Sequence, residues 1–97
     1  PPAELQKVAE AYFSGDYQTA ANLVKPENFS EERARIQALL FRAAANHKLY
    51  VKSGEKRSEI LRQIKIDIRA IKRMNSSFSP YIAAFSPSFL TLFRQTG

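Results

Sequence analysis

The residue types that most often carry out chemistry are few in this chain, and none is well placed for catalysis. His47 is the only histidine, cysteine is absent, and neither an HExxH sequence nor a glycine-rich phosphate loop occurs. His47 falls within an apolar stripe of its predicted helix, which favours a packed histidine over a catalytic one. Glu31 and Glu32 fit a helix start, and Asp67 fits an ion-pair partner. The sequence therefore predicts no catalytic residue, no metal site, no cofactor and no enzyme activity.

A row of cations in the segment 55–74 is the sharpest candidate for a binding site. At about 100° per residue, five basic side chains occupy one arc of a predicted helix, opposite its isoleucine stripe. This basic stripe consists of Arg62, Lys65, Arg69, Lys72 and Arg73, with Ile66 at its edge. An apolar residue among cations indicates a partner that is acidic and partly apolar, such as an acidic helix or peptide.

The basic stripe is also compatible with other roles. A nucleic acid prefers such a stripe as well, but no recognition motif is present and no aromatic residue lies between the cations to stack on bases. A membrane surface fits less well, because the apolar face of this helix is needed for the core. A solvated face without a partner is the remaining alternative.

Length and charge indicate one small folded domain. The chain has 97 residues, of which 44% are hydrophobic, and a net charge of +6. Acidic residues dominate 1–32, whereas 33–73 is strongly basic, and this polarity favours acidic partners. No apolar run reaches the roughly 18 residues of a membrane span. No signal peptide is recognisable, and the opening Pro1-Pro2 indicates a domain 1–97 cut from a longer protein.

Apolar spacing and capping residues predict about five helices. They cover residues 5–13, 17–24, 30–52 and 55–74, with a last helix beginning at Ser86-Pro87 and with breaks at Gly15, Pro26 and Gly54. Asp16 is placed to cap the second helix and Ser30 to open the third. The third helix is apolar on two faces, through Ile36, Leu40 and His47 on one and Ala38, Phe41 and Leu49 on the other. Such a helix packs on two sides, so we expect it to be internal.

The C-terminal region repeats one motif. Phe78-Ser79-Pro80 recurs seven residues later as Phe85-Ser86-Pro87. Serine before proline suits a helix start, because the serine side chain can cap and proline lacks an N–H that would otherwise be unpaired. Phenylalanine before the cap can act as a hydrophobic staple. We therefore predict a turn or short helix through Ala84 and a last helix that seals the core.

The glycine turns resemble those of a tetratricopeptide repeat (TPR), an array of helical hairpins. Gly15-Asp16-Tyr17 with Ala20 after it looks like the turn between the two helices of such a repeat. Leu49-Tyr50 before Gly54 is similar to the end of a second repeat's first helix. The two glycines are 39 residues apart, against about 34 in the standard repeat. The resemblance is therefore to a degenerate repeat.

The second half of the chain extends this resemblance. The run 70–80 is similar to the close of a repeat's second helix, although Glu59 stands where a small residue is expected earlier in that helix. The ending 85–93, FSPSFLTLF, is similar to a tail found after such repeats in bacterial envelope proteins. The resemblance implies a bacterial protein and favours the periplasm or envelope over the cytoplasm.

The expected fold is all-α, with about five helices in antiparallel hairpins and a TPR-like array closed by a C-terminal capping helix. The expected function is a non-catalytic scaffold or adaptor that binds protein, in a bacterial envelope or secretion-related assembly. A nucleic-acid-binding domain using the basic stripe is the alternative, and an architectural or oligomerising domain is the third choice. A second candidate binding face lies on the first helices of the hairpins, at Tyr12, Phe13, Phe41 and Leu49.

Overall fold

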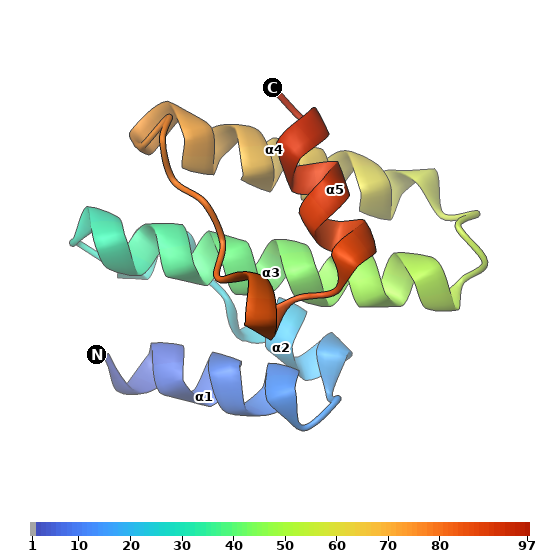
Figure 1. The fold of residues 1–97 in the computed structure, drawn as a ribbon. Helices are drawn as coiled ribbons and strands as arrows, with labels where there is room; N and C mark the ends of the chain where they lie inside the picture. The colour runs from blue at the N-terminus through green and yellow to red at the C-terminus, as the bar shows by residue number, and fades with distance from the viewer. Residues whose placement is uncertain (1) are drawn as a thin grey trace.

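The structure is a computed structural model that describes residues 2–97, which form five α-helices, two short 3-10 helices and no strand (Figure 1). The elements are α1 (Ala3–Phe13), α2 (Tyr17–Leu23), η1 (Pro26–Asn28), α3 (Glu32–Lys52), α4 (Ser58–Met74), η2 (Ile82–Ala84) and α5 (Pro87–Gln95). In Figure 1, α3 lies between α1 and α4, and the chain after α4 crosses α3 before it forms α5. The prediction of an all-α fold with about five helices is confirmed.

The turns after α1 and α3 have the same hydrogen-bond pattern. In each turn the glycine N–H donates to a carbonyl three residues back, and the next N–H donates to a carbonyl five residues back. Gly15 and Gly54 have φ of 88° and 76°, a left-handed conformation that glycine adopts without strain. Asp16 then caps α2, because its carboxylate accepts a hydrogen bond from the N–H of Thr19 at 3.3 Å.

The helix α3 is the most buried one, as its two apolar faces predict. Eight of its residues are buried, more than in any other helix of residues 2–97. One side of α3 places Ala38 in a small cluster with Val8 and Phe29. Leu40 and Ala43 belong to a larger cluster that includes residues of α4 and α5. The side chains of Ala38 and Ala43 are small enough to let neighbouring helices approach closely.

Isoleucines and one ion pair attach α4 to α3. Ile64, Ile68 and Ile71 are each 0% exposed. Arg42 of α3 donates from Nε to Oδ2 of Asp67 and from Nη2 to Oδ1, both at 2.8 Å. The hydrogen bond to Asp67 is the main reason that the pKa of Arg42 is raised above its ordinary value. The prediction that Asp67 is an ion-pair partner is confirmed.

The last helix closes the core in the way that the second copy of the motif predicts. The Oγ of Ser86 accepts a hydrogen bond of 3.2 Å from the N–H of Phe89, and Pro87 is the first helical residue. Phe89 and Phe93 are buried, and the ring of Phe85 lies 5.7 Å from that of Phe89. The aromatic residues of the tail therefore pack into the same cluster as α3 and α4.

The first copy of the motif is followed by the predicted short helix through Ala84, which is η2, but Ser79 does not cap it. No hydrogen bond involves the side chain of Ser79 within residues 2–97, and η2 begins only at Ile82, after an extended residue at Tyr81. Pro80 is buried, and the ring of Phe78 lies 6.1 Å from that of Phe93. Packing of this segment on the core thus replaces the predicted cap, and the chain crosses α3 in a largely extended conformation.

Two helix starts also differ from their predicted positions. α3 begins at Glu32, and Ser30 does not cap it, because the residue before the helix is Glu31 and no side chain bonds to the first turn. α4 begins at Ser58, three residues after the predicted start of 55–74. Glu55 has a φ of 61°, which is incompatible with a right-handed helix, because the turn at Gly54 continues through it.

Candidate functional site

The exposed face of α4 carries four cations around one isoleucine. The cations are Arg62, Lys65, Arg69 and Arg73, of which Lys65 is half-buried and the arginines are exposed. Ile66 is 49% exposed among them. We call these five residues the α4 surface. Because the buried isoleucines of α4 pack on α3, and α4 forms one edge of the molecule in Figure 1, this surface is turned outward.

No carboxylate forms an ion pair with the α4 surface within residues 2–97. The two ion pairs of this part of the chain join Arg42 to Asp67 and Arg57 to Glu59. Asp67 lies on the buried side of α4, and Glu59 is already paired with the arginine that precedes the helix. The surface therefore holds concentrated positive charge without an ion pair in residues 2–97, and the exposed carboxylate on α4, that of Glu59, interacts with the charge of Arg62 one turn away.

Lys72 is set apart from the other cations of the basic stripe. Its ammonium group donates hydrogen bonds to the carbonyls of Phe93 and Thr96 at the end of α5, and it lies 4.9 Å from the centre of the Phe93 ring. A cation at a helix C-terminus also interacts favourably with the helix dipole. These contacts attach the tail to α4. Because they occupy the ammonium group of Lys72, the α4 surface does not include this residue.

The second candidate face is only partly assembled as predicted. The rings of Tyr12, Phe13 and Phe41 lie together, with centroids between 5.2 and 5.8 Å apart. Phe13 is 61% exposed, so the group reaches the surface. Leu49 is not part of it and instead lines a separate depression beside Asn46 and Ile60.

Phe85 joins this aromatic group from the tail, at 5.8 Å from Tyr12 and 6.0 Å from Phe41. Beside it, Tyr81 and Ile82 are 75% and 71% exposed, the highest values among the large apolar residues of 2–97. They line a groove of about 500 Å³ between α3 and the segment 78–85. Neither residue was included in a candidate site predicted from the sequence. Their position as an apolar pair directly after Ser79-Pro80, in a predicted turn, could have indicated that they are exposed.

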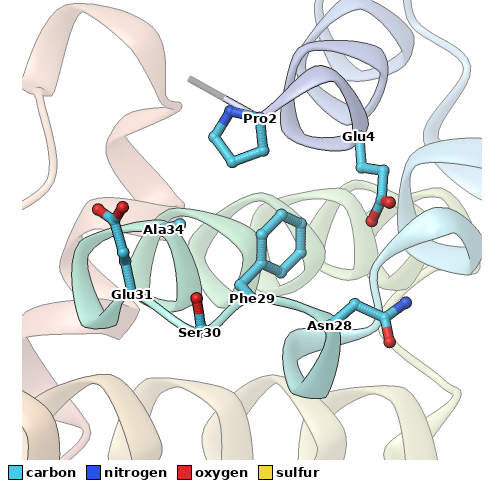
Figure 2. Close-up of a pocket in the computed structure, with 7 residues that line it drawn as sticks. All are labelled: Pro2, Glu4, Asn28, Phe29, Ser30, Glu31 and Ala34. Atoms are coloured by element: carbon cyan, nitrogen blue, oxygen red, sulfur yellow. The ribbon is translucent and has the colours of Figure 1, made fainter.

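A second pocket, of about 420 Å³, opens where α1 and α3 begin and η1 ends (Figure 2). In Figure 2 the ring of Phe29 stands at its centre, and Glu4 and Glu31 line it from different elements. The lining residues that the structure describes include neither a histidine nor a cation. Both carboxylates of the lining belong to exposed residues, so the pocket does not bury them away from water.

Two buried titratable side chains are kept neutral by their surroundings. The side chain of His47 is 6% exposed, and its ring lies 5.6 Å from that of Phe89. Burial, followed by the charge of Lys48, lowers the pKa of His47 below its ordinary value. Burial, followed by Tyr17, raises the pKa of Tyr12 to about 12. Each residue is therefore uncharged near neutral pH and behaves as part of the core.

Residues 2–97 hold no group of three or more histidine, cysteine, aspartate or glutamate side chains arranged for a metal ion. Among the helices that these residues form, none combines the length and apolar character needed to cross a bilayer.

Comparison of the chain with protein-family models, with curated proteins and with solved structures finds no match. A functional assignment therefore has to be argued from the side chains of this chain alone.

Proposed function

We propose that this chain is a non-catalytic protein-interaction module that binds an acidic partner on the α4 surface. The observation that carries the proposal is the set of four cations, which form no ion pair in the described part of the chain, around the half-exposed Ile66. Like charges one helical turn apart destabilise a helix. The burial of the opposite side of α4 against α3 holds these charges in place, and an acidic partner relieves their repulsion.

The hairpins α1–α2 and α3–α4 are, in this proposal, degenerate TPR-like repeats of a scaffold in a bacterial envelope or secretion-related assembly. The turns at Gly15 and Gly54 match each other and are compatible with a repeat, although such glycine turns end many helices of other folds. The 39-residue spacing and Glu59 remain departures from the standard pattern. The envelope assignment rests on the resemblance of the ending 85–93 alone.

Capture of partners from a lysate of the source organism tests the function. The bait is the wild-type chain or a triple variant with Arg62, Lys65 and Arg69 replaced by glutamate. The matched control reverses three lysines that are exposed elsewhere on the molecule and gives the same net charge; they are Lys7, Lys25 and Lys56. We expect the α4 variant to lose the captured protein and the control to keep it, with both folded by circular dichroism. Identical captures by all three baits would rule out the α4 surface as the site.

Nucleic-acid binding is the second candidate, and the positive charge of the α4 surface is the observation that favours it. Nuclease treatment of the captured material separates the two functions. If a nucleic acid is the partner, the captured species disappears with nuclease, and log affinity falls linearly with log salt with a slope set by the number of phosphates contacted. Protein capture that survives nuclease and falls moderately with salt is the result expected from the proposal.

A further inference from the structure

Four of the five residues of the α4 surface lie on one straight line, and this geometry restricts the shape of the partner. Arg62, Ile66, Arg69 and Arg73 follow one another at steps of four, three and four residues. At about 1.5 Å per residue, the line is roughly 16 Å long, or three helical turns. We propose that the partner is an acidic amphipathic α-helix that docks along α4, with carboxylates over the arginines and an apolar side chain over Ile66. This inference rests on the proposed function above.

A helix is the partner whose own periodicity reproduces this line. Side chains at steps of three, four or seven residues lie on one face of an α-helix, so carboxylates seven and four residues apart repeat at the intervals of the three arginines. An extended strand advances about 3.3 Å per residue and alternates its side chains between two faces, so its spacing does not match over three turns. Docking of one helix face against another with a few anchor residues is a common mode of peptide recognition.

The charge pattern supplies both attraction and selectivity. Arg62, Arg69 and Arg73 have no carboxylate within ion-pairing distance in residues 2–97, so a partner does not have to compete with an internal one. Arginine also binds carboxylates in a two-pronged geometry that an ammonium group cannot provide. Lys65, which is half-buried, adds a further positive charge beside the line.

Ile66 favours a protein helix over a nucleic acid. It is 49% exposed and lies within the line of arginines, where a nucleic acid would place phosphates or base edges. The other exposed residues of α4 are charged, apart from Ser58 at its start, so the surface has no asparagine, glutamine or aromatic side chain to bind bases. An apolar side chain of a partner helix covers Ile66 without leaving polar groups unpaired.

The small size of the surface predicts a weak and reversible complex. Three turns of helix bury less than the ~1,200 Å² at the low end of stable interfaces. We therefore expect a dissociation constant on the order of 10 μM in low salt, with fast exchange. Because the arginines are exposed, salt screens their charges, and the affinity should fall as salt is added. The screening length is about 10 Å at 0.1 M salt.

The test uses the 97-residue chain and designed peptides of about 20 residues, stapled on the far face because short helices are marginal in water. The patterned peptide carries glutamate, leucine, glutamate and glutamate at steps of four, three and four residues, so that the leucine can face Ile66 and the glutamates the arginines. The control peptide has the same composition with its glutamates spread around the helix. Fluorescence anisotropy should show the patterned peptide binding at least about tenfold more tightly, or about 1.4 kcal/mol.

Matched protein variants locate the contact. Ile66→Asp should weaken binding of the patterned peptide by about tenfold or more, because a carboxylate replaces the apolar contact and repels the partner. Val51→Asp is the control, because Val51 is 48% exposed on α3 and lies outside the α4 surface. Backbone amide shifts on titration should concentrate in α4, around the α4 surface.

Several results would overturn the inference. Equal affinity for the two peptides would show that the surface attracts charge without selecting a helix. Tighter binding of a 20-base-pair duplex that is insensitive to Ile66→Asp would assign the surface to nucleic acid. Self-association of the chain in sedimentation, reversed by the same variant, would assign it to a second copy. The peptides could fail to bind while capture of a partner from the lysate still depends on Arg62, Lys65 and Arg69. In that case the inference that the partner is a helix is wrong, and the proposed function remains.

Discussion

The buried ion pair between α3 and α4 provides a quantitative test of how these helices are held together. Asp67 is 1% exposed, whereas 24% of the Arg42 side chain remains exposed. Arg42→Met leaves a buried carboxylate whose remaining hydrogen bond is the one from Gln63 at 3.0 Å. We expect the free energy of unfolding to fall by about 4 kcal/mol, as for other broken buried pairs. Asp67→Leu leaves a guanidinium that water can reach, so its cost should be smaller, about 2 kcal/mol.

The double variant Arg42→Met/Asp67→Leu should lose less than Arg42→Met alone, because it leaves no unpaired charge in the core, although leucine is larger than the buried aspartate and adds an overpacking cost of about 1 kcal/mol or more. Urea unfolding of the wild type and the three variants, monitored by far-ultraviolet circular dichroism, measures the free energy of unfolding of each protein. The comparison holds when the slope of this free energy against urea concentration is the same for all four. The resulting double-mutant cycle should show a coupling energy of at least about 2 kcal/mol.

Two outcomes would refute this reasoning. Additive losses in the double variant would mean that the two side chains contribute independently, despite the two hydrogen bonds of 2.8 Å between them. A larger loss for Asp67→Leu than for Arg42→Met would mean that the difference in exposure does not set the cost of the unpaired charge.

The remaining predictions concern the tail and His47. Ser86→Ala should cost about 1 kcal/mol in urea unfolding, because it removes the cap of α5, whereas Ser79→Ala in the other copy of the motif should cost nothing. Lys72→Met should cost about 1.5 kcal/mol because two carbonyls lose a charged donor, while Lys65→Met should cost less than about 0.5 kcal/mol. Since burial lowers the pKa of His47 below 6.5, the unfolded chain binds a proton more readily than the folded chain. Stability should fall as the pH drops below about 6.5, and His47→Gln should remove that part of the loss in thermal melts. Equal losses of stability for the two serine variants, or for the two lysine variants, would contradict these expectations. So would a pH profile of stability that His47→Gln leaves unchanged.

Local patterns in the sequence were sufficient to predict most of the helices. Gly15 and Gly54 end α1 and α3, Asp16 caps α2 and Ser86 caps α5, because turns and caps depend on residues within about five positions. The same holds for the two apolar faces of α3, which follow from a period of 3.6 residues. Packing overrode the predicted cap at Ser79-Pro80, which lies in an extended crossing of α3 before η2 begins at Ile82. The start of α4 differs for a local reason, because the turn at Gly54 continues through Glu55.

The sequence by itself determined which side of α4 is buried and that its opposite side is cationic, because helical periodicity alone separates the two faces. Only the tertiary structure decided what each side chain contacts. Lys72 and Lys65 are equivalent in the pattern, yet only Lys72 bonds to the end of α5. Phe85, and not Leu49, completes the aromatic group. These contacts join residues far apart in the chain, so they depend on how the helices cross, which spacing along a single helix does not encode.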